Sequence, residues 1–320
     1  MTASDIFSEP LLVVVGPTAI GKTDLSLRIA RQYNCEIISV DSMQVYRHMD
    51  IGTAKASLRE RNEIPHHLID IIDPDQDYDA ARFASDASQA IRNIRSRGRL
   101  PLLTGGTGLY LRTLFAGIFP GAPVDEKIRA ELRMRLQTEG CSKLHEELAA
   151  VDCLSAERIH KNDSQRLLRA LEVYYTSGVP WSEHLRSHKS QAPPSLFSNT
   201  LEIGLTCDRG ELYDRINRRC QMMLESGLEG EVRKLLEMGY GRKLKSFGAI
   251  GYRHMTGYID QEYSWQEMAE LLARDTRRYA KRQYTWFKTM ERLKWHEAKA
   301  REEIIGAVGN WLEKQQNGGS

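Results

Sequence analysis

The chain has 320 residues, and its 45 lysines and arginines nearly balance its 43 aspartates and glutamates, for a net charge of +2. This balance excludes a globally basic nucleic-acid-binding protein, so any such contact must come from local clusters of charge. The five cysteines are scattered without a C-x-x-C pair, which excludes a typical disulfide framework or zinc site. The apolar run at 11–15 is far too short to span a bilayer. We expect a soluble, cytoplasmic protein of about two domains, without a membrane partner.

A phosphate-binding loop is the first feature along the chain. The run at 11–15 predicts a buried strand, and a helix is predicted from Thr23 to about Tyr33. Between them lies the pattern G-x-x-x-x-G-K-[ST] in the strand–loop–helix context that it requires. Backbone N–H groups and the positive end of the helix would face a phosphate, and the last residue of the pattern offers a hydroxyl to Mg²⁺. The predicted di- or triphosphate site comprises Gly16, Pro17, Thr18, Ala19, Ile20, Gly21, Lys22 and Thr23.

Two further strands end in residues that could react. The run at 36–40 predicts a strand that ends at Asp41, and the run at 100–104 leads into a glycine-rich corner that contains Thr107. The carboxyl ends of parallel strands gather along one edge of a sheet, so we expect both residues beside the phosphate loop. Asp41 is then a general base or a metal-shell carboxylate, or alternatively an N-cap. The corner either meets a second part of the ligand through Thr107 or is a tight structural turn.

The middle of the chain changes in character. Strand-like runs disappear after residue 125, and charged helical patterns predict helices at 126–138, 143–151 and 156–176. The segment at 187–199 predicts a linker, and the run at 201–206 predicts a strand that returns to the sheet. We therefore predict an α/β fold, with a P-loop NTPase-like parallel sheet core, a helical insertion domain and a helical C-terminal region. The predicted division is a core of 1–122 plus 200–320 and a helical insertion of 123–199.

The remaining segments are a connecting region at 52–80, a helix at 80–97 and a last third that is mostly helical. This last third includes a glycine-rich corner at 246–253 and a polar helix after 297. Its most informative stretch is 274–288, where six basic residues and one acidic residue alternate with aromatic ones. Cations neutralise phosphates, and flat rings stack on unpaired bases. The stretch is therefore either an RNA-contacting helix or a solvated helix face.

In combination, these motifs resemble the tRNA dimethylallyltransferases. The resemblance covers nearly the whole chain and depends on the order of seven motifs: GPTAIGKT at 16–23, DSMQVYR at 41–47, PHHLID at 65–70, TGGTGLY at 104–110, NDSQR at 162–166, IGYR at 250–253 and KRQYTWF at 281–287. The chain departs from the family at 248–249, where many bacterial members have Arg-Cys and this chain has Gly-Ala.

The resemblance implies transfer of a dimethylallyl group from its diphosphate to the exocyclic amine of the adenosine 3′ to a tRNA anticodon. Asp41 would accept a proton from the amine, and Thr107 would orient the reacting groups. Mg²⁺, bound through Thr23, would help to stabilise the diphosphate leaving group. We expect a monomer that binds the tRNA anticodon stem-loop. The alternatives are a prenyltransferase of free adenine nucleotides, a P-loop nucleotide kinase and a non-catalytic RNA-binding NTPase.

The same resemblance implies that the insertion at 123–199 is a tRNA-binding domain, and it implies which residues contact tRNA. They fall into five groups along the chain: Asp41, Ser42, Met43 and Gln44 with Thr107; Arg129; Gln165, Arg166, Leu167, Leu168 and Arg169; Gly248, Ala249, Ile250, Gly251, Tyr252 and Arg253; and Lys281, Arg282, Gln283, Tyr284, Thr285, Trp286, Phe287 and Lys288.

Overall fold

The computed structural model describes residues 9–117, 125–191 and 197–317. Contacts divide the chain into two compact units, one formed by residues 1–115 with 196–320 and the other by residues 116–195. The predicted boundary at 122–123 and the two prolines of the predicted linker lie outside the described residues. Among the helices that are described, none is long and apolar enough to cross a membrane.

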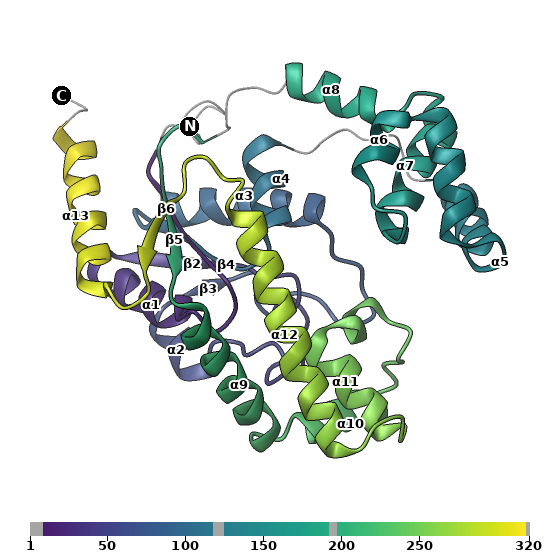
Figure 1. Ribbon diagram of the computed structural model, residues 1–320. Coiled ribbons are helices and arrows are strands. Elements are labelled where there is room, and N and C mark those ends of the chain that lie inside the picture. The colour runs from purple at the N-terminus through teal and green to yellow at the C-terminus, as the bar shows by residue number, and fades with distance from the viewer. Residues whose placement is uncertain (1–8, 118–124, 192–196, 318–320) are drawn as a thin grey trace. The chain divides into compact units, whose positions relative to one another are not determined.

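The first unit contains a six-stranded sheet in the order β3-β2-β4-β1-β5-β6 (Figure 1). All neighbouring strands are parallel, and the predicted α/β class is confirmed. The strands are β1 (Leu11–Val15), β2 (Cys35–Val40), β3 (His66–His67), β4 (Leu100–Gly105), β5 (Thr200–Thr206) and β6 (Lys294–Glu297). Strands β3 and β6 were not predicted from the sequence, because neither contains an apolar run.

Helices cover both faces of this sheet. Leu12 and Val14 belong to a core with α1 (Lys22–Tyr33), α9 (Arg209–Glu225) and α13 (Arg301–Asn317). Leu11, Val13 and Val15 point the other way, into a core with α3 (Ala80–Ser96) and α4 (Gly108–Ala116). This alternation follows from the period of two in a strand, and burial on both faces explains why β1 is continuously apolar. The loops that leave β1, β2 and β4 therefore emerge along one edge of the sheet.

A third apolar cluster supports the loop that follows β2. Val45, Met49 and Ile72 pack against α10 (Leu228–Glu237), α11 (Ile250–Ile259) and the first part of α12 (Trp265–Phe287). The region 52–80, which the sequence suggested was a connection, contains α2 (Leu58–Glu63) and β3. The predicted corner at 246–253 is a 3₁₀ turn at Lys245–Gly248, followed by the first residues of α11.

The second unit is helical, with α5 (Glu126–Val151), α6 (Cys153–Arg158), α7 (Ser164–Ser177) and α8 (Trp181–Gln191). Gly140, at a φ of 82°, interrupts α5 between the two helices predicted there. The single helix predicted at 156–176 is wrong, because the chain turns after α6 and begins α7 anew. The Asp163 side chain caps α7 by accepting a hydrogen bond from the Arg166 amide. Leu144, Leu167 and Leu171 form part of this unit's core.

Candidate active site

The ends of β2 and β4 meet through direct hydrogen bonds. The amides of Gly106 and Thr107 both donate to the Val40 carbonyl oxygen at 3.1 Å. In return, the Ser42 amide donates to the Thr107 hydroxyl at 3.1 Å. The structure thus brings Asp41 and Thr107 together at the edge of the sheet where the phosphate loop also lies, as parallel strands require.

Asp41 has one oxygen engaged by its own loop. Its Oδ1 accepts hydrogen bonds from the amides of Met43 at 2.8 Å and Gln44 at 3.3 Å. These two bonds fix the carboxylate. They resemble the bonds of an N-cap, which the sequence analysis gave as the alternative role for Asp41. Within the described part of the chain, Oδ2 has no hydrogen-bond donor. One carboxylate oxygen is therefore held and the other is available to accept a proton.

The phosphate loop surrounds the Lys22 side chain. Gly21 has a φ of 105°, in the region that favours glycine, and α1 starts at the next residue. The Lys22 ammonium donates to the carbonyl oxygens of Gly16 at 2.9 Å and Pro17 at 2.8 Å. Burial and the nearby Arg219 lower the pKa of Lys22 to about 7, while the charge of Asp41 acts in the opposite direction. An anion bound in the loop would therefore stabilise the charged form of Lys22.

Arg219, on α9, completes the positive side of this site, and no pattern in the sequence indicated it. Burial lowers the pKa of its guanidinium, and the Asp41 carboxylate opposes that change. No hydrogen bond or ion pair with any described residue holds this guanidinium. Arg219 also borders a cavity of about 370 Å³, whose walls include Lys55, Met222 and Met223. An unpaired arginine beside Lys22 provides a second donor for a diphosphate.

Helix α12 closes the site from the other side. The Gln283 Oε1 accepts a hydrogen bond from the Thr18 amide at 2.8 Å, and its Nε2 donates to the Gly106 carbonyl at 3.0 Å. A Cβ on Gly106 would lie 2.1 Å from that Nε2, so a larger residue there would displace the Gln283 amide from both of its bonds. Close packing thus gives Gly106 a structural reason to be glycine, while ligand contact through Thr107 stays a prediction.

Tyr279 lies one turn before Gln283 and was not predicted as a site residue. Burial, followed by the charge of Asp41, raises the pKa of its hydroxyl, whereas hydrogen bonding to Thr107 and Gln283 acts in the opposite direction. Its phenol therefore adjoins both residues that the sequence marked for chemistry. In the sequence, the only indication is that Tyr279 and Gln283 are four residues apart, which places them on the same face of α12.

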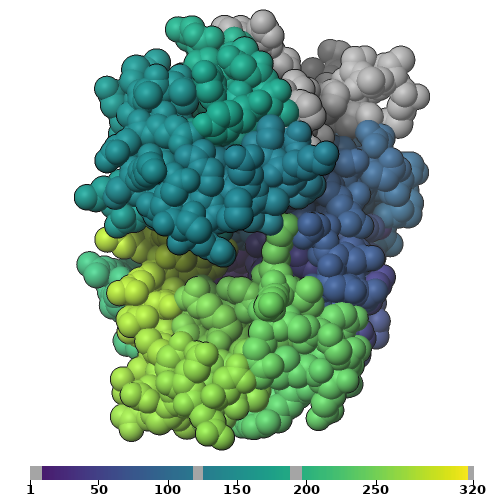
Figure 2. All heavy atoms as spheres, turned by 90° about the vertical axis from the view of Figure 1, so that its right-hand side faces the viewer, coloured from purple at the N-terminus to yellow at the C-terminus, as the bar shows by residue number. Residues whose placement is uncertain are grey.

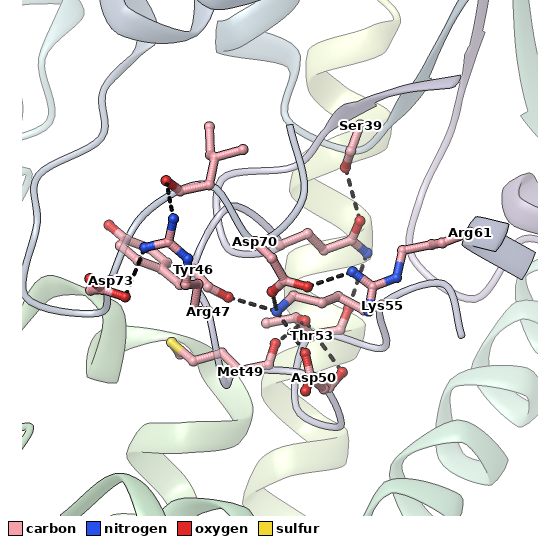
Figure 3. Close-up of polar contacts among 12 residues, drawn as sticks. Ser39, Tyr46, Arg47, Met49, Asp50, Thr53, Lys55, Arg61, Asp70 and Asp73 are labelled. Atoms are coloured by element: carbon pink, nitrogen blue, oxygen red, sulfur yellow. Dashed lines mark hydrogen bonds and ion pairs between the residues drawn. The ribbon is translucent and has the colours of Figure 1, made fainter. Parts of the chain in front are cut away.

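The loop after β2 is held by an internal polar network (Figure 3). Gln44 accepts a hydrogen bond from the Ser39 hydroxyl at 2.9 Å, and its Nε2 donates to the Thr53 carbonyl at 3.3 Å. The side chain of Lys55 is 2% exposed, and its ammonium donates to the Tyr46 carbonyl at 2.6 Å. It also pairs with Asp50 and Asp70, and Arg61 binds the other oxygen of Asp70. This network fixes the backbone between β2 and α2.

The residues predicted to contact tRNA in the first unit divide by exposure. Side chains that face solvent belong to Arg253, Lys281, Arg282, Thr285 and Lys288. By contrast, Tyr252, Gln283 and Phe287 are buried. Trp286 packs over Gly108 and under the Arg112 guanidinium. The RNA contacts predicted for these stretches remain predictions, and the buried side chains have structural partners of their own.

In the second unit, a buried carboxylate organises the predicted contacts. Glu172, on α7, is 3% exposed and forms ion pairs at 3.0 Å with both Arg129 and Arg169. Arg166 is exposed and lies near Asp163, whereas Leu167 is fully buried in the core of this unit. Two of the predicted basic contacts therefore share one acidic partner.

Comparison with known proteins agrees with this geometry. The family model described as IPP transferase matches residues 44–290, and the one described as isopentenyl transferase matches residues 10–68. The chain is 56% identical to the tRNA dimethylallyltransferase of Desulfotalea psychrophila, over 96% of this chain and 97% of that protein. It is 44% identical to tRNA dimethylallyltransferase 2 of Syntrophus aciditrophicus, over 98% and 99%.

Solved structures give the same result. The tRNA isopentenylpyrophosphate transferase of Bacillus halodurans is 41% identical, with a TM-score of 0.71, over 97% of this chain and 99% of that one. A eukaryotic dimethylallyltransferase acting on tRNA is 29% identical, with a TM-score of 0.79, over 96% and 80%. The resemblance inferred from the sequence motifs is confirmed: the chain belongs to the IPP transferase family.

Proposed function

We propose that this protein transfers a dimethylallyl group from dimethylallyl diphosphate to the exocyclic amine of the adenosine 3′-adjacent to a tRNA anticodon, releasing diphosphate. The observation that supports this reaction best is the grouping of Lys22, Arg219 and Asp41, which interact electrostatically at one edge of the sheet. Two cations suit a diphosphate, and a carboxylate beside them suits a nucleophile that must lose a proton. The relatives named as tRNA dimethylallyltransferases support the same assignment.

The phosphate loop serves a leaving group in this reaction. The C–O bond of dimethylallyl diphosphate breaks, and both of its electrons go to the diphosphate. Lys22 and Arg219, together with the loop amides, stabilise the negative charge that develops on the departing oxygen. Lys22 is already positioned by the Gly16 and Pro17 carbonyls, so little reorganisation is needed as the bond breaks.

Asp41 serves the nucleophile. The amine of adenine is a poor nucleophile, because its lone pair is delocalised into the purine. As this lone pair forms the C–N bond, the amine proton passes to the free oxygen of Asp41, acting as a general base. Thr107, which binds the Ser42 amide, and the Tyr279 phenol adjoin this carboxylate and orient the base. The adenosine must leave the stack of the anticodon loop to reach Asp41.

We further propose Mg²⁺ as the cofactor, held by the Thr23 hydroxyl and by the diphosphate itself. Thr23 is exposed next to Lys22 at the start of α1. The described residues contain no group of three or more His, Cys, Asp or Glu side chains that could hold a metal ion. This donor set suits Mg²⁺, which commonly takes one or two protein ligands and completes its shell with phosphate oxygens and water. When bound, the ion would offset part of the negative charge that develops on the diphosphate.

We propose that the enzyme acts as a monomer in the cytoplasm, where tRNA is found. One chain supplies every residue assigned to the reaction, from the loops after β1, β2 and β4 and from α1, α9 and α12. The exposed cations Lys281, Arg282 and Lys288 near the carboxyl end of α12 support RNA binding beside the reaction site.

The decisive experiment is mass spectrometry of tRNA nucleosides after incubation of the purified protein with tRNA, Mg²⁺ and dimethylallyl diphosphate. We expect one adenosine per modified tRNA to gain a dimethylallyl group in place of one hydrogen, with equimolar release of diphosphate. A product formed on AMP without tRNA would instead assign the protein to the prenyltransferases of free nucleotides. Phosphoryl transfer from ATP, without any prenylated product, would assign it to the kinases.

A further inference from the structure

Outside the reaction site, three arginines gather around Asp275. This carboxylate, whose side chain is 13% exposed, contacts Arg274 at 3.1 Å and Arg278 at 3.3 Å on its own helix, α12. From α11, Arg253 binds it at 2.5 Å and His254 at 3.2 Å. Three guanidinium groups therefore share one carboxylate, and the cluster carries an excess of positive charge.

These arginines continue a basic stripe along α12. In a helix, positions separated by three, four or seven residues lie on one face. Arg274, Arg278, Lys281 and Lys288 follow this spacing, and all four are exposed. The opposite face holds the buried Ala280 and Phe287, together with the residues that reach the reaction site. Asp275 is the one acidic residue between 274 and 288. No acidic residue therefore opposes the stripe between the Asp275 cluster and the end of the helix.

The charge of Asp275 stabilises the fold, but stability does not explain why three arginines surround this single carboxylate. Exposed ion pairs contribute about 0 to 1 kcal/mol each, and two like charges at a spacing of four destabilise a helix. Arg274 and Arg278 have that spacing, and their side chains are 45% and 64% exposed. The half-exposed Arg253 approaches from a second helix. Like charges that gather at a solvent-facing surface are stabilised when a polyanion covers them.

The cluster also has the geometry that phosphates require. A guanidinium has five N–H donors, and one or two bonds to Asp275 leave the others free for a second anion. Holding each side chain by Asp275 reduces the rotamer entropy that an arginine loses on binding. In the lower part of Figure 2, the yellow-green segment that contains α12 lies beside the green segment that contains α10 and α11.

We propose that Arg274 and Arg278 bind backbone phosphates of the tRNA beside Arg253, which the family resemblance already marks as a tRNA contact, and that they extend the contact surface of Lys281 and Lys288 by two turns along α12. This inference depends on tRNA being the substrate, as proposed above. The contacts are to the backbone, so they strengthen binding without regard to base sequence. They lie on the face of α12 opposite the reaction site, so they do not touch the reacting groups.

The test compares two variants of the full-length protein with intact tRNA. In Arg274→Gln/Arg278→Gln, we expect the KM for tRNA to rise by about tenfold and the kcat at saturating tRNA to stay unchanged. The slope of log affinity against log salt should flatten by about 0.7 to 0.9 for each lost contact. The matched control is Arg277→Gln on the same helix, since Arg277 bonds to Asn217 and lies over Tyr213. It should leave both quantities unchanged.

The outcomes separate this inference from the proposed function. If the wild-type protein prenylates tRNA and the double variant keeps its KM and salt slope, the inference is wrong and the function stands. An equal loss in Arg277→Gln would also overturn it, because any positive charge would then serve. If the wild-type protein does not modify tRNA at all, the proposed function itself is wrong.

Discussion

Gln283 accepts a hydrogen bond from the backbone amide of Thr18, 265 positions earlier in the chain, at 2.8 Å. The same side chain donates to the Gly106 carbonyl, so one amide group links the phosphate loop to the corner after β4. A leaving-group site and a nucleophile site must keep a fixed separation for a direct displacement. Gln283 sets that separation from a third element, α12.

Replacing Gln283 with leucine removes both bonds and leaves the two backbone groups without partners. Because each unsatisfied buried group costs about 1–3 kcal/mol, we expect a clear loss of stability in urea unfolding. Misplacement of the loop should also lower kcat by up to about 10²-fold. The control is Gln266→Leu, since Gln266 is exposed on the same helix and bonds only within its own turn. Normal turnover in Gln283→Leu would show that the link does not matter for catalysis.

Arg219→Gln should weaken the use of dimethylallyl diphosphate. The variant keeps a hydrogen-bonding side chain but loses the charge that adjoins Lys22 and Asp41. Because removal of one preorganised donor costs about 10²–10³ in rate, kcat/KM for the diphosphate should fall by a similar factor in steady-state kinetics. Arg218→Gln is the matched control, since Arg218 is the exposed neighbour on the same helix. If Arg219→Gln were as active as this control, Arg219 would have no role in binding the leaving group.

Asp41→Asn tests the general base. An amide is isosteric and can still accept the bonds from Met43 and Gln44, so the loop should keep its conformation. It cannot take up a proton, and we expect kcat to fall by about 10²–10⁴-fold. Affinity for tRNA, measured by filter binding, should stay near that of the wild-type protein. A variant with nearly normal turnover would show that the proton goes elsewhere.

The sequence was sufficient to predict those site residues that directly follow a strand. The phosphate loop, Asp41 and Thr107 each follow an apolar strand directly, so parallel strands were enough to bring them to one edge. Arg219 could not be predicted in this way, because it lies in a charged helix among Arg215 and Arg218 and differs from them only by its tertiary position. Gln283 was predicted to contact tRNA, yet its side chain is buried between two loops.

Short strands and buried polar side chains were missed for a related reason. Strand β6 reads Lys-Trp-His-Glu and has no alternating or continuous apolar pattern. It exists because β5 offers it an edge. Lys55 looks like a surface lysine in a polar connection, but its ammonium is enclosed by Tyr46, Asp50 and Asp70. A partner fifteen residues away determines its burial, and no local pattern reports such a contact.

Lys55→Met should therefore be costly. The change keeps the length of the side chain but leaves Asp70 with one cationic partner, Arg61, instead of two. Asp70 is 28% exposed and keeps Arg61, so the loss should be about 1–3 kcal/mol, as for a buried polar group that loses one partner, which urea unfolding would detect. Lys245→Met is the control, since Lys245 and its partner Asp77 are both more than two-thirds exposed. Equal stability of the two variants would contradict a structural role for Lys55.

Asp275 predicts how stability depends on acidity. Burial alone would raise its pKa, but Arg274, together with His254 and Arg253, holds the pKa at about 2, below the ordinary value of 3.8. A carboxyl whose pKa is depressed in the folded state stabilises the fold above its unfolded pKa, and this contribution is lost as pH falls through the folded pKa. Asp275→Asn lacks the contribution at every pH. The difference in unfolding free energy between wild type and variant should be constant above about pH 5 and should narrow from pH 4 towards pH 2.

Asp260→Asn is the matched control for this measurement, because Asp260 is one-third exposed and pairs with a single arginine, Arg242. At neutral pH, the unfolding free energy of Asp260→Asn should differ less from that of the wild-type protein than does that of Asp275→Asn, since one exposed pair contributes little. Suppose that the difference in unfolding free energy between the wild-type protein and Asp275→Asn stays constant down to pH 3. The arginines would then not be what holds the carboxylate in its charged form. The arginine side chains would then be solvated and would not be held by Asp275. The cluster would therefore lack the fixed geometry that the proposed phosphate binding requires.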